Sequence, residues 1–137
     1  MTSTSLIQAL HDALTPHARG LVCAYLFGSQ ARQEAGAHSD VDLAVLYREE
    51  PPLGLDGLGL DLAAALERAV GRPVDLVVLN RASPDLIHRV LRDGILVLEN
   101  DASARIRFEM KARAEYFDVL PYLREYRRGP GARHDRP

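Results

Sequence analysis

The chain has 137 residues and a formal net charge of −2, with 47% hydrophobic and 26% charged residues. This composition fits one globular domain and provides no overall positive charge that would attract nucleic acid. The one cysteine, Cys23, excludes an intramolecular disulfide, and no apolar run approaches the roughly 20 residues that a membrane span needs. We therefore expect a cytoplasmic protein that is not inserted in a membrane.

The first half of the chain predicts helices that alternate with short strands. Leucine and isoleucine at helical spacing predict a helix over residues 4–16, and the apolar run Leu21–Phe27 predicts a strand. Val41–Tyr47 predicts a second strand. It is apolar on both faces beyond the aspartates, which indicates that both faces of the sheet are covered. A second long helix is expected over Asp56–Val70, with Gly71 as its C-terminal stop.

The second half continues this alternation. Val74–Leu79 predicts a third strand, and Ser83 and Pro84 predict the start of a helix that ends near Arg92. A fourth short strand is expected over Ile95–Leu98. The pattern predicts an α/β fold in which helices pack on a small sheet, and it leaves the strand order open.

A last helix is expected from a cap at Asp101 or Ser103, with Pro121 kinking or restarting it. We expect residues 1–128 to form a single domain. The stretch 129–137 is rich in glycine, proline and charge, which predicts a disordered tail.

Two acidic residues stand at the start of the second predicted strand. Asp40 and Asp42 are two residues apart, so both side chains share one face, with Cα atoms roughly 6.5–7 Å apart. Two carboxylates on one face repel each other unless a cation joins them. Oxygen ligands without histidine or thiolate favour Mg²⁺ or Mn²⁺, and Mg²⁺ fills its remaining positions with water and phosphate oxygens. The pair therefore indicates a nucleoside triphosphate substrate.

The residues after the first predicted strand suit the phosphates of such a substrate. Gly28 permits a close approach of the backbone, and a helix opening at Ser29 would direct N–H groups at an anion. Arg32, one turn further on, is placed to reach phosphate or to brace the loop. The chain contains no P-loop motif.

A third acid, Asp75, opens the third predicted strand. If that strand lies beside the second, Asp75 joins Asp40 and Asp42 in one cluster that holds metal and deprotonates a hydroxyl. Taken alone, the pair Asp40 and Asp42 and the pair Gly28 and Ser29 are more typical of polar turns, and Asp75 is equally typical of a strand edge. Their order and spacing, from Gly28 and Ser29 to the aspartates, favour a catalytic site.

The spacing Gly28-Ser29-x10-Asp40-x-Asp42, followed by a strand aspartate, resembles the polymerase-β-like nucleotidyltransferase superfamily. The words LFGSQAR and RFEMKARAEYFDVLPYLREYRR resemble the minimal nucleotidyltransferases called MntA, over about residues 5–127. This resemblance implies a small mixed β-sheet with helices packed on it and a long C-terminal helix.

The resemblance also implies a function and a partner. The protein would be an antitoxin that transfers AMP from ATP to a tyrosine of an all-helical HEPN ribonuclease toxin, HepT, in a hetero-oligomer. Gly28, Ser29 and Arg32 would contact the nucleotide, Asp40 and Asp42 would bind Mg²⁺ or Mn²⁺, and Asp75 would be the base or a further metal contact. No direct contact with nucleic acid is expected.

Two other functions fit the same motif. One is an antitoxin that acts by binding alone, and the other is a nucleotidyltransferase for a small molecule such as an aminoglycoside. Enzymes of the second kind usually carry another domain, for which 137 residues leave little room. The arginines of the second half alternate with glutamates, which is typical of a solvated helix face and less often of a surface for an acidic partner.

Overall fold

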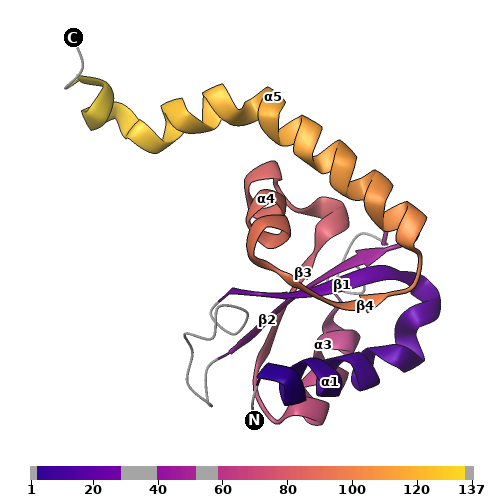
Figure 1. Ribbon diagram of the computed structural model, residues 1–137. Helices are drawn as coiled ribbons and strands as arrows, with labels where there is room; N and C mark the ends of the chain where they lie inside the picture. Colours follow the sequence, from indigo (N-terminus) through magenta and orange to yellow (C-terminus); the bar gives the residue numbers. More distant parts are fainter. Residues whose placement is uncertain (1–2, 29–39, 52–58, 135–137) are drawn as a thin grey trace.

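The structure is a computed structural model that describes residues 3–28, 40–51 and 59–134, with side chains as far as residue 125. Within these residues, one mixed sheet has the strand order β3-β2-β1-β4 (Figure 1). The strands are β1 (Leu21–Phe27), β2 (Val41–Tyr47), β3 (Val74–Val78) and β4 (Ile95–Glu99). β1 runs antiparallel to β2 and β4, whereas β2 runs parallel to β3. The expected α/β fold with a small mixed sheet is confirmed.

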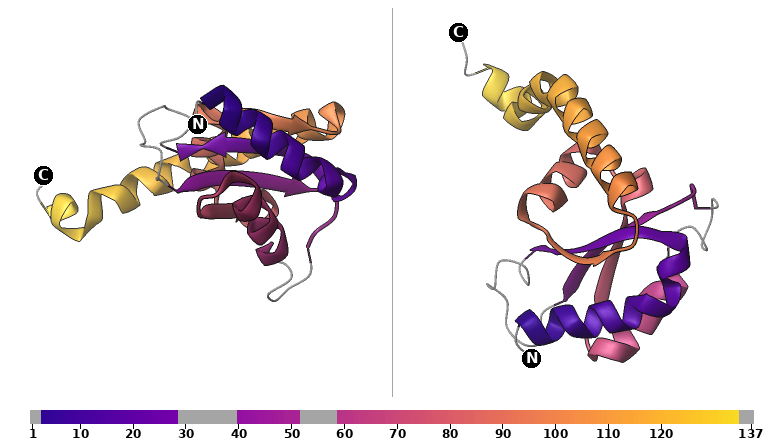
Figure 2. Two further views of the ribbon diagram at one scale, coloured as in Figure 1. Left: turned by 90° about the horizontal axis from the view of Figure 1, so that it is seen from below. Right: turned by 45° about the vertical axis from the view of Figure 1, so that its right-hand side comes forward.

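Helices cover both faces of this sheet. α1 (Ser3–Leu14), which leads into the 3-10 helix η1 (Thr15–Gly20), packs with α3 (Leu60–Val70) on one face. α4 (Pro84–Asp93) and α5 (Ala102–His134) pack on the other face. Figure 2 shows the two helix pairs on opposite sides of the strands. None of the described helices is long and apolar enough to cross a membrane.

The central strands are apolar on both faces because both faces are covered. Alternate residues of β1 divide between the two hydrophobic clusters: Ala24 and Leu26 pack toward α1 and α3, and Cys23 and Tyr25 pack toward α4 and α5. The bounds of β1 and β2 agree with the sequence prediction. β3 ends at Val78, one residue before the predicted end, because the short 3-10 helix η3 (Leu79–Arg81) begins at the next residue.

The predicted start of the second long helix was wrong. The sequence predicted a helix from Asp56, but α3 begins at Leu60, and residues 56–58 lie outside the described part of the chain. Gly59 has a φ of 73°, in the left-handed region, so a right-handed helix cannot run through it. The predicted C-terminal stop at Gly71 is confirmed, with its N–H donating to the carbonyl of Glu67.

Serine and aspartate caps fix the starts of the last two helices. The Ser83 hydroxyl accepts a hydrogen bond from the Leu86 N–H at 3.3 Å, and the Asp101 carboxylate accepts one from the Ala104 N–H at 3.0 Å. α5 continues through Pro121 to His134, so residues 129–134 of the expected tail are helical here. Extending an existing helix avoids the unfavourable nucleation step, which offsets weak helix formers at its end.

A partly buried polar cluster attaches α5 to the sheet. The Tyr25 hydroxyl of β1 donates to Glu109 of α5 at 2.6 Å, and Arg105 donates to the same carboxylate oxygen at 2.8 Å and to Glu99 at 2.6 Å. Burial raises the pKa of Tyr25, and its hydrogen bond to Glu109 raises it further. Burial acts to raise the pKa of Glu109, but the hydrogen bonds from Tyr25 and Arg105 outweigh it and hold this pKa below its ordinary value.

Tyr25→Phe is expected to lower the free energy of unfolding by about 1–2 kcal/mol, because the Glu109 carboxylate loses a buried donor. Urea denaturation monitored by circular dichroism measures this change. Tyr122→Phe is the matched control on the exposed side of α5, where the tyrosine is 76% exposed and the change should stay within about 0.5 kcal/mol. Equal stabilities of Tyr25→Phe and wild type would contradict the importance of this bond.

The depressed pKa of Glu109 makes its contribution depend on pH. Because the carboxylate is ionised more easily in the folded chain, its stabilisation is present above its ordinary pKa of 4.5 and is lost as the pH falls through the folded value. The difference in unfolding free energy between wild type and Glu109→Gln should therefore be largest near neutral pH and shrink below pH 4.5. A free-energy difference that stays constant as the pH falls below 4.5 would contradict the role given to the Glu109 carboxylate.

Candidate active site

The parallel pairing of β2 and β3 places two acidic side chains side by side. Asp42 is the second residue of β2, Asp75 is the second residue of β3, and the two are register partners. Val41 and Leu43 pack toward α1 and α3, so the alternation of the strand directs Asp42 to the opposite face, beneath α4. Asp42 is half-buried, whereas Asp75 is exposed. The condition under which Asp75 would join Asp42, a third strand beside the second, is therefore met.

Asp40 stands at the entrance of β2. It is exposed and precedes Val41, whose N–H donates to the carbonyl of Pro73 at 2.9 Å and so joins the starts of β2 and β3. Within the described residues, no three histidine, cysteine, aspartate or glutamate side chains converge closely enough to hold a metal ion. The structure therefore brings Asp42 and Asp75 together on one face but does not gather all three predicted carboxylates at one point.

Gly28, at the end of β1, lies directly against the carboxylate of Asp42. Phe27 is the register partner of Asp42, and Gly28 follows with a φ of 74°. A Cβ atom at this position would overlap Oδ2 of Asp42. Glycine is therefore required both by the backbone conformation and by the carboxylate beside it. The other two predicted nucleotide contacts, Ser29 and Arg32, lie outside the described residues.

Gly28, Asp42 and Asp75 form the floor of an open cleft of about 510 Å³, and α4 forms its opposite wall. Arg89 and Arg92, at i and i+3, line this wall, and Asp93 lies beside them. Arg92 makes a bidentate pair with Asp93, at 2.9 Å from Nε and 2.8 Å from the guanidinium NH2 group, and this pair raises the pKa of Arg92. Cations on α4 thus face carboxylates on the sheet across one cleft.

Arg89 and Arg92 were not predicted as site residues, because arginines that alternate with glutamates are typical of a solvated helix face. The available signal was their i and i+3 spacing on α4, the first α-helix after the strand of Asp75, which places both on one helix face.

The chemistry of the cleft fits a hard divalent cation. The polar side chains on its floor are carboxylates, and neither histidine nor cysteine is found among the described residues that line it. Oxygen ligands of this kind suit Mg²⁺ or Mn²⁺, and Gly28 leaves room beside Oδ2 of Asp42 that a larger residue would fill. The arginines add positive charge where an anionic substrate would enter.

Comparisons with known proteins agree with this geometry. The family model of the polymerase beta nucleotidyltransferases matches residues 10–103. A Methanocaldococcus jannaschii relative, named as a candidate protein adenylyltransferase, is 37% identical over 79 residues, which cover 58% of this chain and 82% of that protein.

The fold is also similar to solved structures of toxin–antitoxin complexes. The crystal structure of a toxin–antitoxin with AMP-PNP has a chain with a TM-score of 0.73 and 27% identity, covering 87% of this chain and 93% of that one. The structure of the tri-AMPylated Shewanella oneidensis HEPN toxin in complex with MNT antitoxin has a chain with a TM-score of 0.70 and 25% identity. The match covers 90% of this chain and 94% of that one. The family resemblance inferred from Gly28 and the aspartates is thereby confirmed, and this chain belongs to the polymerase beta nucleotidyltransferase family.

Proposed function

We propose that this protein is an antitoxin that transfers AMP from ATP to a tyrosine of a HEPN-family toxin, with Mg²⁺ or Mn²⁺ as the metal. The observation that carries the proposal is the in-register pair of Asp42 and Asp75 beside Gly28. The similarity to an antitoxin in complex with an AMPylated HEPN toxin, and to a chain of a toxin–antitoxin with AMP-PNP, supports the substrate and the partner.

The proposed reaction is a substitution at the α-phosphorus of ATP. The tyrosine oxygen forms a bond to this phosphorus, the bond from it to the β-phosphate oxygen breaks, and pyrophosphate leaves with the electron pair. The phenol proton passes to a base, for which the exposed carboxylate of Asp75 is the candidate in this cleft. If Asp75 is instead a metal contact, the proton passes to solvent.

The other proposed site residues bind and orient the triphosphate. Asp40 and Asp42 hold the metal, which when bound neutralises charge on the phosphates. Gly28 lets the backbone approach them, and Ser29 and Arg32 add donors. Arg89 lines the opposite wall, where its guanidinium suits the negative charge that accumulates on the leaving pyrophosphate.

Replacing both aspartates of the motif tests the metal site. Asp40→Ala with Asp42→Ala should reduce transfer of labelled AMP to the toxin by at least about a hundredfold, because charge on the triphosphate is no longer neutralised. The matched control is Asp12→Asn on α1, beneath the other face of the sheet, which should label at the wild-type rate. Undiminished labelling by the double variant would remove Asp40 and Asp42 from the mechanism.

The same double variant distinguishes catalysis from occlusion. If cells that express the toxin are rescued by the double variant although no AMP is transferred, then binding alone neutralises the toxin and the catalytic proposal fails. If rescue and labelling are lost together while the two proteins still copurify, transfer of AMP is the protective step.

Two glycine substitutions distinguish the effect of a Cβ that collides with Asp42 from the effect of backbone strain alone. Gly28 and Gly71 have nearly equal φ values, 74° and 71°, so alanine at either position should cost about 1–2 kcal/mol of stability. A Cβ meets Oδ2 of Asp42 at Gly28 but finds nothing within 4 Å at Gly71. We expect Gly28→Ala to lose AMP transfer and Gly71→Ala to keep it, as measured by labelling at a temperature where both are folded. Equal activities would show that the contact with Asp42 does not matter.

A further inference from the structure

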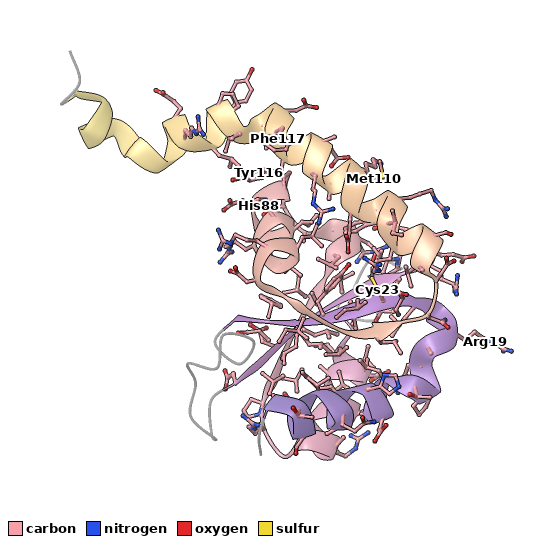
Figure 3. All side chains as sticks on the ribbon, viewed as in Figure 1. Arg19, Cys23, His88, Met110, Tyr116 and Phe117 are labelled. Atoms are coloured by element: carbon pink, nitrogen blue, oxygen red, sulfur yellow. The ribbon has the colours of Figure 1, made fainter. Side chains whose placement is uncertain are left out.

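A second hollow lies beside the cleft, between α4 and α5. This groove has a volume of about 310 Å³ and a mainly apolar lining. Its walls are formed by His88, Leu91 and Arg92 of α4 and by Ala112, Tyr116 and Phe117 of α5. Figure 3 shows Tyr116 directed from α5 toward His88, with Phe117 next to it on the helix.

The groove and the cleft adjoin at Arg92, which lines both. On α4, His88 of the groove lies about one turn from Arg92, and so does Arg89 of the cleft. A ligand in the groove would therefore lie beside the cleft that contains Asp42 and Asp75.

Stacked rings give this groove a rigid wall. The rings of His88 and Tyr116 stack with centroids 3.8 Å apart and planes within 3° of each other. Phe117 meets Tyr116 edge-on at 6.2 Å and is itself 69% exposed. Because the stack already joins α4 to α5, Phe117 is left as an apolar ring that faces solvent at the side of the groove.

Two arginines stand at the rim of the groove. Arg92 and Arg113 lie on opposite walls, one on each helix. Each has an acidic neighbour in the chain: Asp93 pairs with Arg92, and Glu109 contacts Arg113 at 3.4 Å. Both arginine side chains remain more than half exposed, at 58% and 52%, so their guanidinium groups are accessible to a further carboxylate.

We propose that this groove binds the segment of the partner protein that carries the acceptor tyrosine. The partner and the acceptor are those of the proposed function, on which this inference rests. The lining selects an aromatic or aliphatic side chain next to the tyrosine, and the rim selects an aspartate or glutamate beside it. An acidic, apolar segment held there presents its tyrosine hydroxyl to the cleft across Arg92.

The other ligand of suitable size is the adenine base of ATP. The charged rim argues for the peptide, because adenine has no negative charge to pair with Arg113 on α5. The two ligands predict different outcomes in a binding experiment that does not require catalysis.

The experiment measures binding of short fluorescein-labelled peptides by fluorescence polarisation. One peptide has a tyrosine flanked by leucine and aspartates, and its counterpart has lysines in place of the aspartates. Wild type should bind the acidic peptide about tenfold more tightly. Arg113→Glu should reverse this preference, and Phe117→Ala should lower the affinity for the acidic peptide by about tenfold.

Met110→Ala is the matched control, because Met110 lies on the same helix, is 66% exposed and does not line the groove. It should bind both peptides as wild type does, and thermal denaturation should show that all three variants are folded. Calorimetric titration with AMP-PNP and Mg²⁺ should give the same nucleotide affinity for wild type, Phe117→Ala and Met110→Ala.

Two results would overturn the inference. The first is failure of wild type to bind the acidic peptide, or binding that Phe117→Ala and Arg113→Glu leave unchanged. The second is a loss of AMP-PNP affinity in Phe117→Ala without a loss of peptide affinity, which would assign the groove to the nucleotide. If peptide binding follows the prediction but no AMP reaches the partner, the groove stands and the proposed function fails instead.

Discussion

The parallel pairing of β2 with β3 is the constraint on which the site depends. It sets Asp42 and Asp75 in register on one face, where two carboxylates repel each other and Asp42 is partly removed from water. The surrounding strand residues are buried and apolar, so their packing holds this arrangement against the repulsion. A bound cation would reduce the repulsion between these two carboxylates, which agrees with the proposed metal site.

Local signals in the sequence were sufficient for the strands that form this site. β1 and β2 are apolar runs with breakers at their ends, Gly20 and Gly28 around one and Asp40 before the other, and both were predicted with the observed bounds. Whether Asp75 would join Asp42 depended on the strand order. Strand order is decided by long-range packing, so the spacing of residues in the sequence could not provide it.

Residues outside the motif became recognisable only in the folded chain. Arg89 and Arg92 have the charged, periodic pattern of an ordinary surface helix, and their importance comes from the position of α4 above the carboxylates. The role of Gly28 also changed: the sequence indicated a close approach to phosphate, and the structure adds the contact with Asp42. The start of α3 was missed because the left-handed conformation of Gly59 ends the helical pattern abruptly.

The layer of α4 and α5 joins the cleft to the groove of the proposed partner segment. α4 contributes arginines to the cleft, and its stack with Tyr116 fixes its position against α5. α5 is in turn attached to the sheet through Glu109 and Tyr25, a bond that starts on the same strand as Gly28. Because the groove and the cleft share Arg92, the proposed acceptor surface and the proposed nucleotide site are built from one set of packed elements.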